Sequence, residues 1–470
     1  MAKRAKLSEP RRIQDLELKH ELRDPIHGLI QLTDQEMDIV NTSVFQRLRR
    51  IKQLALADLV YPGALHTRFE HLLGSLHVAN RILLRLDRIE HIFYNDARLV
   101  RLAALLHDVG HGPFSHVSEY LLDKYSVKAQ GRQREKIHES ITSDIIRRTP
   151  ELKSVLGADV EGIVLLIKGS GKRNFRRDIV SSSLDADKMD YLLRDAYYAG
   201  VQYGLYDLDK IIEAMRILPI VRLDESYLVI SHEGLFAVEQ LILAKHHMTQ
   251  QVYGHRVRVI TDAMIVRGLE LAIKASDQLR KAYSYDGSQE QLDLYLKLDD
   301  NQVTQEVFNS GDQRAKQIFS RLRERKLFKE LALIPIDDKN VSNSVTRTHL
   351  LAFGEKGKET EIGDLEEQVA SFLGCEPWQV IIHIKSIKNP AYVSAASPDP
   401  EGVQILARDG EPQTLDQFDE VAKGSLPQTY RLHVIGPLPN NGEKYLSGSD
   451  TRKDLEAKIR KIIFRQVGGV

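Results

Sequence analysis

The sequence has one cysteine, no long apolar run and no excess of charge of either sign. The lone Cys375 excludes an intramolecular disulfide and a zinc site built from several cysteines, so any metal must be bound by histidine and carboxylate. Lys and Arg number 66, as do Asp and Glu, which removes the overall positive field expected of a nucleic-acid-binding protein. No apolar run approaches the roughly 20 residues that cross a bilayer, and the first residues hold no apolar signal segment. We therefore expect a cytoplasmic protein that does not contact a membrane.

The spacing of apolar residues predicts a mainly α chain with a smaller α+β lobe at its C-terminal side. Residues 1–15 open with a basic run, and we expect a disordered tail there. In residues 16–335 apolar side chains recur at intervals of three and four, which is typical of amphipathic helices. In residues 336–470, segments 379–387 and 429–435 alternate as strands between turns rich in Gly, Pro, Asn and Asp.

Histidines are concentrated near the end of one predicted helix. Ten of the 17 lie in the first 138 residues, and three of these stand between positions 107 and 116. Helix 97–106 is stopped by the glycines and proline that follow it, and at a helix end the backbone can turn. His107 and Asp108 can therefore converge on one ion, and an imidazole with a carboxylate suits Fe, Mn or Zn. One His-Asp dipeptide is a weak signal by itself.

Two further segments offer polar side chains that could join His107 and Asp108 at one site. His71 begins a predicted helix and shares its inward face with Leu72, next to a phosphate-binding cation at Arg68. Asp187 is followed on another helix, at intervals of four, by Tyr191 and Asp195. A hydrogen-bonded core histidine would explain His71 equally well, and a solvated helix would explain the second stripe.

Taken together, these segments resemble the HD-domain phosphohydrolases, and most closely the deoxynucleoside triphosphate triphosphohydrolases, including the enzyme that joins a sterile-alpha-motif domain to an HD domain. The resemblance covers residues 20–260 and implies a helical HD-domain core. The motifs that carry it are Arg23–Gly28 (RDPIHG), Phe45–Leu54 (FQRLRRIKQL), Tyr61–Ala64 (YPGA), Arg68–Gly74 (RFEHLLG), His107–His116 (HDVGHGPFSH) and Asp187–Tyr191 (DKMDY).

The resemblance implies a metal centre with catalytic histidines beside it. A divalent ion (Fe, Mn, Zn or Mg) would be held by His71, His107, Asp108 and Asp187, with further Mg²⁺ on the substrate phosphates. The phosphate-contacting and proton-transfer groups would be His111, His116 and His138, with Glu119 orienting them. We expect His116 to be the general acid, because a histidine with its usual pKa of about 6.5 can donate a proton near neutral pH.

The resemblance also implies a deoxynucleotide pocket. Arg68, Lys188 and Tyr191 would face the phosphates, and Gln53 and Asp195 would bind the sugar 3′-hydroxyl. Tyr191 beneath the sugar would leave no room for a 2′-hydroxyl, which would be buried unpaired at a cost of about 1–3 kcal/mol. A further phosphate contact is expected from Lys245, where the family pattern has arginine and so a bidentate grip.

A second, activating nucleotide site is only partly matched. Gln46 and Arg49 fit its pattern, whereas Asn41 and Asp209 depart from it. An amide at position 41 accepts hydrogen bonds from guanine more weakly than a carboxylate does. We therefore expect little activation by a guanine nucleotide.

Three functions remain open from the sequence. The first is hydrolysis of a deoxynucleoside triphosphate to deoxynucleoside and inorganic triphosphate by water attack on the α-phosphorus, in a homo-dimer or tetramer. The second is hydrolysis of another nucleotide or phosphoester at the same metal. The third is a regulator that binds nucleic acid or nucleotides, against which the zero net charge argues.

Overall fold

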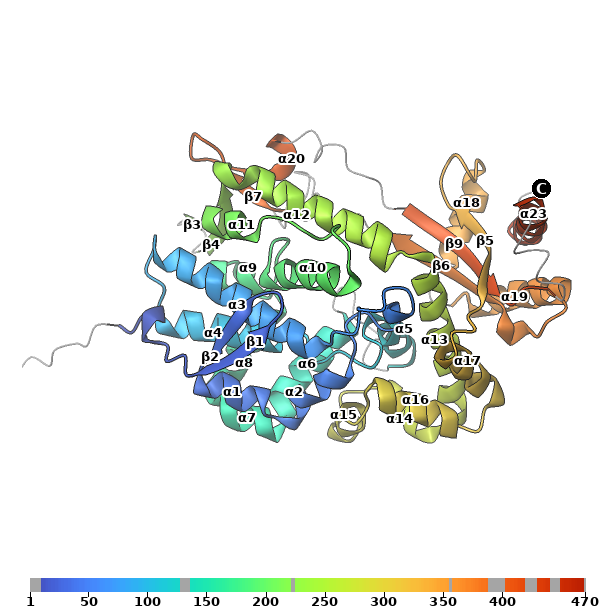
Figure 1. Cartoon of the computed structure of the whole chain (residues 1–470), viewed down its shortest axis with the longest axis horizontal. Coiled ribbons are helices and arrows are strands. Elements are labelled where there is room, and N and C mark those ends of the chain that lie inside the picture. Colours follow the sequence, from blue (N-terminus) through green and yellow to red (C-terminus); the bar gives the residue numbers. More distant parts are fainter. Residues whose placement is uncertain are drawn as a thin grey trace, which may run out of the picture.

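The protein is mainly helical, with small sheets and an α+β part toward the C-terminal end, as the sequence predicts (Figure 1). The computed structural model describes residues 10–126, 136–220, 225–354, 357–387, 402–418, 429–439 and 449–468. None of the helices in these ranges combines the length and the apolar composition needed to cross a membrane.

The helical part carries every residue of the expected site. Its helices are α1 (Asp34–Val40), α2 (Ser43–Arg47), α3 (Arg68–Asp87), α4 (Tyr94–Leu106), α5 (His116–Tyr125), α6 (Ile137–Arg148), α7 (Pro150–Leu156), α8 (Val160–Ile167), α9 (Phe175–Val180), α10 (Ala186–Ala199), α11 (Leu208–Ala214), α12 (Leu235–Met248), α13 (Arg256–Ala275), α14 (Asp277–Tyr283), α15 (Gln289–Leu296), α16 (Asp300–Asn309) and α17 (Gln313–Arg323). A π-helical turn, Thr249–Tyr253, extends α12.

Helices α3, α4 and α10 form the centre of the helical part. A capping box fixes the start of α3: the Thr67 amide donates to Glu70 Oε2 at 2.9 Å, and the Thr67 side chain caps the Glu70 amide in return. The N-cap Asp185 accepts from the Lys188 amide at the start of α10, and Gly200 ends that helix in the left-handed region at φ 69°. Both helix starts are therefore specified locally, which sets where the side chains of their first turns lie.

Three small sheets accompany the helices. Strands β1 (His20–Asp24) and β2 (Gly28–Leu32) form a hairpin. A second sheet has the order β3-β4-β7-β8, made from Met215–Ile220, Glu225–Ser231, Gln404–Leu406 and Pro412–Thr414. The third has the order β5-β9-β6, made from Lys329–Pro335, Thr429–Gly436 and Ile381–Ile387.

The third sheet and three helices make up the lobe at one end of the molecule (Figure 1). The helices are α18 (Ser344–Ala352), α19 (Glu359–Leu373) and α23 (Ser449–Gln466). They bury a hydrophobic cluster of their own, separate from that of the helical part, with Ile334, Leu350, Val369, Val434 and Ile459 at its centre.

Two boundaries differ from those expected. Ile13–Asp15 form a short 3-10 helix, and buried Ile13 donates its amide to the Ile92 carbonyl at 3.0 Å, so the tail expected for residues 1–15 runs too far. Residues 1–9 lie outside the described residues. Within 336–470, β7 leaves the lobe and pairs in parallel with β4, placing Ile405 opposite Ile230, and α20 (Leu415–Phe418) follows there (Figure 1).

Candidate metal centre and active site

Three helices bring the four expected metal ligands together. His71 lies on α3, His107 caps the C-terminal end of α4 with Asp108 directly after it, and Asp187 lies in the first turn of α10. Their ligand atoms all lie within 4.8 Å of one another. The shortest separations join Asp187 Oδ1 to Nε2 of His71, at 3.1 Å, and to Nε2 of His107, at 3.5 Å.

The two imidazoles are held with the same nitrogen facing the centre. Nδ1 of His107 lies 2.9 Å from the Ala104 carbonyl, and Nδ1 of His71 lies 2.8 Å from Asp190 Oδ2. Because Nδ1–H donates in each case, Nε2 is the nitrogen whose lone pair can bind a metal ion. Both Nε2 atoms are buried and have no hydrogen-bond partner among the described residues. Two such nitrogens and two carboxylates fit a divalent ion of the Fe, Mn or Zn type.

The electrostatics of the cluster favour added positive charge. Burial would lower the pKa of His71, but Asp187 and Asp190 outweigh it and raise the pKa to about 10. Burial would raise the pKa of Asp108, yet the neighbouring imidazoles of His111 and His107 and the Arg68 guanidinium hold it well below its usual range. The field that stabilises a proton on His71 would also stabilise a bound divalent cation, which would take the proton's place.

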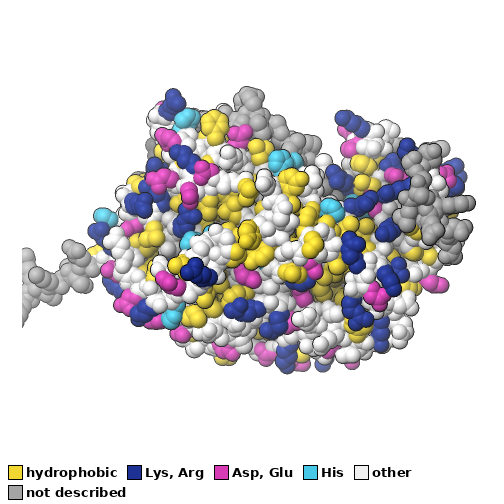
Figure 2. Space-filling view, viewed as in Figure 1, with side chains coloured by type: hydrophobic (Ala, Val, Ile, Leu, Met, Phe, Trp, Pro, Cys, Tyr) yellow, Lys and Arg dark blue, Asp and Glu magenta, His cyan; other side chains and the backbone are white. Residues whose placement is uncertain are grey.

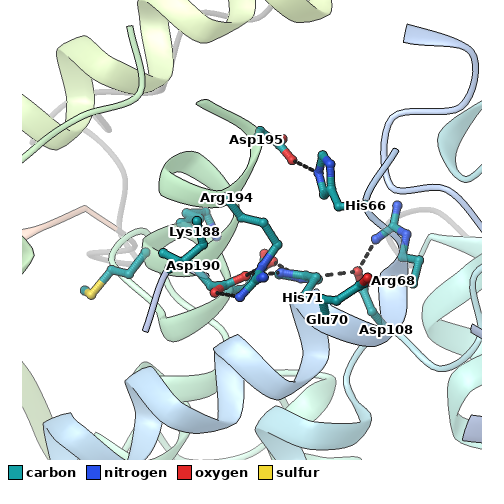
Figure 3. Close-up of polar contacts among 12 residues, drawn as sticks. His66, Arg68, Glu70, His71, Asp108, Lys188, Asp190, Arg194 and Asp195 are labelled. Carbon is teal, nitrogen blue, oxygen red and sulfur yellow. Dashed lines mark hydrogen bonds and ion pairs between the residues drawn. The ribbon is translucent and has the colours of Figure 1, made fainter. Parts of the chain in front are cut away.

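Behind His71 lies a buried network to which the sequence analysis assigned no role. Asp190 accepts hydrogen bonds from Nε and Nη2 of Arg194, both at 2.9 Å (Figure 3). Its Oδ1 also lies 2.6 Å from Nε2 of His27. Arg194 also donates to Asp24 Oδ2 at 2.7 Å. His27 and Asp24 belong to the RDPIHG segment and Asp190 to the DKMDY segment. The sequence signal for this network was therefore the presence of these polar residues inside the two motifs.

The four expected metal ligands, His71, His107, Asp108 and Asp187, are called the quartet below. Beside the quartet, three histidines surround one carboxylate. Oε1 of Glu119 lies 2.7 Å from Nδ1 of His138, 3.1 Å from Nδ1 of His116 and 3.3 Å from Nδ1 of His111. The rings of His111 and His138 stack at 4.1 Å. Of the three side chains, His116 is the exposed one, at 60%. It can therefore meet a ligand that enters from solvent, while Glu119 fixes its orientation.

Arg68 is buried against this cluster. It forms an ion pair with Asp108 and donates from Nε to the Ser115 hydroxyl at 3.0 Å, while its buried Nη2 has no partner among the described residues. That free donor suits the phosphate role expected for it. Asp108 also lies within 4.8 Å of His111 and His138, but the charge of Arg68 opposes a second cation there.

The two lysines expected at the phosphates lie near each other. Lys188 donates to Asp185 Oδ2 at 2.6 Å and to the Ser182 carbonyl at 2.9 Å. Burial, and then the charge of Lys188, lower the pKa of Lys245 to about 8. An anion bound between these two ammonium groups would relieve their repulsion. The two lysines can therefore bind a phosphate, although Lys188 also donates to Asp185, the N-cap of α10.

The residues expected around the sugar adjoin the quartet on α10. Asp195 Oδ1 lies 2.7 Å from Nε2 of His66 (Figure 3), and Asp195 Oδ2 accepts from the Tyr253 hydroxyl at 2.6 Å. The Tyr191 ring lies edge-on to that of Tyr253, with centroids 6.5 Å apart. The Gln53 amide donates to the His66 carbonyl at 3.0 Å, and its side-chain Oε1 is buried without a partner among the described residues. His66 and Tyr253 are members of this group that the sequence analysis missed.

The two residues expected at the activator site contact each other. Arg49 donates to Gln46 Oε1 at 2.8 Å and lies over the Phe69 ring, 3.5 Å from its centroid. Of the two departures from the pattern, Asn41 caps the end of α1, and Asp209 forms an ion pair with Arg81. The activator site stays a prediction.

Two family models match the chain: an HD domain over residues 68–195 and an HD associated region over residues 212–397. The uncharacterised protein YwfO of Bacillus subtilis is 33% identical over 330 residues, which cover 66% of this chain and 70% of YwfO. An uncharacterised protein of Methanocaldococcus jannaschii is 37% identical over 248 residues, which cover 53% of this chain and 49% of that protein. This chain therefore spans about half the length of the archaeal relative.

Two further similarities carry functional names. A deoxynucleoside triphosphate triphosphohydrolase SAMHD1 homolog of Dictyostelium discoideum is 30% identical over 329 residues, covering 66% of this chain and 59% of that protein. The crystal structure of a phosphohydrolase from Bacteroides thetaiotaomicron superposes with a TM-score of 0.68 at 27% identity, covering 89% of this chain and all of that one.

Proposed function

The chain belongs to the HD-domain family of metal-dependent phosphohydrolases, and from that premise we propose that it hydrolyses deoxynucleoside triphosphates to deoxynucleoside and inorganic triphosphate. The observation that carries the proposal is the order of side chains along α10. The metal ligand Asp187, the flat ring of Tyr191 and the hydrogen-bonding Asp195 follow one another at intervals of one helical turn. This is the order in which a deoxynucleotide presents phosphate, sugar ring and 3′-hydroxyl.

The reaction would use the quartet and the histidine group together. A bound divalent ion would polarise the α-phosphorus and lower the pKa of a water molecule. Arg68, Lys188 and Lys245 would bind the phosphates, the first through its free Nη2. The 5′-oxygen is a poor leaving group as an alkoxide, so His116 would give it a proton while Glu119 holds Nδ1 of that ring.

Selectivity for deoxyribose would come from Tyr191. Its ring stands between His71 and Tyr253, 6.5 Å from each ring centre. A ribose 2′-hydroxyl packed on this ring would lose its water without gaining a partner. Asp195 and Gln53 supply the polar atoms for a 3′-hydroxyl instead.

Assembly and activation belong to the same proposal. The Dictyostelium discoideum relative is named for deoxynucleoside triphosphate hydrolysis. We propose a homo-oligomer, dimer or tetramer, in which Gln46 and Arg49 give at most weak binding of a nucleotide activator. Further Mg²⁺ would accompany the substrate phosphates.

Product analysis tests the proposal. The purified protein is incubated with each deoxynucleoside triphosphate and each ribonucleotide under several divalent metals, and the products are separated by chromatography. We expect deoxynucleoside and intact triphosphate, with ¹⁸O from labelled water only in the triphosphate. Early orthophosphate with a diphosphate product would exclude attack at the α-phosphorus. It would favour the second function, hydrolysis of another phosphoester.

The third function, a nucleic-acid-binding regulator, has less support. On the face drawn in Figure 2, Lys and Arg side chains are interspersed with Asp and Glu. Binding to the nucleic-acid backbone depends on clustered positive charge and falls steeply with salt. Tight DNA binding with a steep salt dependence, in a protein that hydrolyses no nucleotide, would favour the regulator.

A further inference from the structure

The loop that carries the catalytic histidines is held by a segment far along the chain. Residues 107–115 connect α4 to α5, which begins at His116, and the segment Tyr295–Asp300 lies outside the HD-domain match. The Tyr295 hydroxyl donates to the Gly110 carbonyl at 2.8 Å. Buried Arg47 bridges the two segments, since it donates to the His111 carbonyl at 3.0 Å and to the Leu298 carbonyl at 2.8 Å. The loop is therefore fastened from outside its own domain.

Asp300 makes the third connection, and it joins the loop to the substrate side. Its Oδ1 accepts from the Phe114 amide at 2.7 Å, and its Oδ2 accepts from the Lys52 amide at 3.0 Å. Lys52 precedes Gln53, and its carbonyl accepts from the Ser115 hydroxyl at 2.7 Å. One buried carboxylate, 9% exposed, thus links the loop before α5 to the turn that carries Gln53.

The loop needs such support because its backbone is strained. Phe114 and Ser115 have φ angles of 58° and 53°, in the left-handed region that residues with a side chain seldom adopt. Such conformations persist only where surrounding contacts hold them. Ser115 directly precedes His116, so the geometry at these two residues sets where the exposed imidazole lies.

We propose that Asp300 is a positioning residue of the hydrolysis reaction, which fixes the proton donor His116 relative to the substrate contact Gln53 by accepting one backbone hydrogen bond from each segment. The proposal rests on the function proposed above, in which His116 donates the proton. A carboxylate suits the task because each oxygen accepts from a different amide. Asparagine has the same shape, yet its NH₂ would meet one of the two N–H donors.

The ionisation of Asp300 gives the proposal an internal check. Burial raises its pKa to about 6, against the hydrogen bonds from Phe114 and Lys52. The charged and titratable groups that act on it are Lys52, Asp299, Arg47 and Tyr283. As the pH falls through this value the carboxyl gains a proton and loses one acceptor. The native protein should then approach the behaviour of an Asp300→Asn variant.

The test compares Asp300→Asn with Asp299→Ala in the full chain. Asp299 caps the same helix by accepting from the Gln302 amide at 2.9 Å and pairs with Arg50, so its loss destabilises α16 without removing a hydrogen bond to the loop. For Asp300→Asn we expect kcat to fall at least about 10-fold, KM to change less than about 3-fold and the metal to be retained. For Asp299→Ala we expect kcat within about 2-fold of the native value.

Two more readouts separate positioning from a general loss of structure. The ratio of kcat of the native protein to kcat of Asp300→Asn should decrease as the pH is lowered from about 7.5 to about 5.5. Amide hydrogen exchange in peptides covering residues 107–118 should be faster in Asp300→Asn than in the native protein or in Asp299→Ala. Unchanged exchange in Asp300→Asn, unchanged kcat, or an equal loss of kcat in both variants would overturn the inference.

Failure of the proposed function would look different. It would appear as a native protein that leaves deoxynucleoside triphosphates intact. The kinetic comparison would then use whichever nucleotide the native protein hydrolyses, and the exchange comparison would need no substrate. Each result therefore bears on one proposal without deciding the other.

Discussion

Replacing Asp190 by asparagine tests how the buried network orients His71, an expected metal ligand. Asp190 is fully buried and serves His71, Arg194 and His27 through its two oxygens. Asparagine keeps the shape but removes the charge and turns one acceptor into a donor. Wherever its NH₂ lies, it meets a hydrogen-bond donor of Arg194, so the hold on Nδ1 of His71 must weaken.

The expected loss of metal affinity is about 10- to 100-fold, the range found when a residue that orients a metal ligand is changed. This corresponds to about 1.4–2.7 kcal/mol of binding free energy. The cost in folding stability should stay below the about 3–5 kcal/mol that follows when a buried charge loses its partner. Arg194 keeps its second carboxylate, Asp24, at 2.7 Å.

The assay is a titration of metal-stripped protein with Mn²⁺ or Co²⁺ against a competing chelator, with thermal unfolding measured alongside. Asp24→Asn is the matched control. It removes a carboxylate charge that pairs with the same Arg194, whereas the hydrogen bond to Nδ1 of His71 comes from Asp190 and stays in place. We expect its Kd to change less than about 3-fold. A native Kd in Asp190→Asn, with the protein folded, would refute the reasoning, and an equal loss in both variants would assign the effect to Arg194.

Three further outcomes are expected. Asp187→Ala should lose bound metal and activity together while the fold survives, and full metal occupancy by elemental analysis would move the site elsewhere. His116→Ala should keep its metal and lose about 10²- to 10⁴-fold in kcat; a loss confined to KM would make this side chain a phosphate contact only. Because Asn41 and Asp209 depart from the activator pattern, we expect GTP to increase the rate of deoxynucleotide hydrolysis by less than several-fold. Steep growth of turnover and tetramer with GTP would contradict that reading.

The metal quartet was predictable because each of its residues lies inside a short motif. His71, His107 and Asp187 all stand where a helix begins or ends, and local capping residues fix the starts of α3 and α10. The structure brings the side chains together, and metal binding by them stays a prediction. The contact between His27 and Asp190 was not predictable from spacing, since the two residues are 163 positions apart and meet only where the turn between β1 and β2 packs against α10.

Short elements were the harder part of the fold. The alternation in 429–435 predicted β9, which has eight residues, whereas β7 has three and no pattern of its own. Its place beside β4 depends on an open sheet edge in the helical part, which no local signal reveals.

The position of β9 in the middle of the lobe's sheet has a consequence for synthesis. Both of its neighbours, β5 and β6, precede it in the chain, and β5 ends roughly 90 residues before β9 begins. At translation speeds of about 5–20 residues per second, β5 waits about 5–20 s on the ribosome for its partner. During that interval its apolar side chains and open edge are available to other nascent chains. The lobe therefore passes through an interval in which β5 has no strand partner, and a pause in translation after β5 would lengthen that interval.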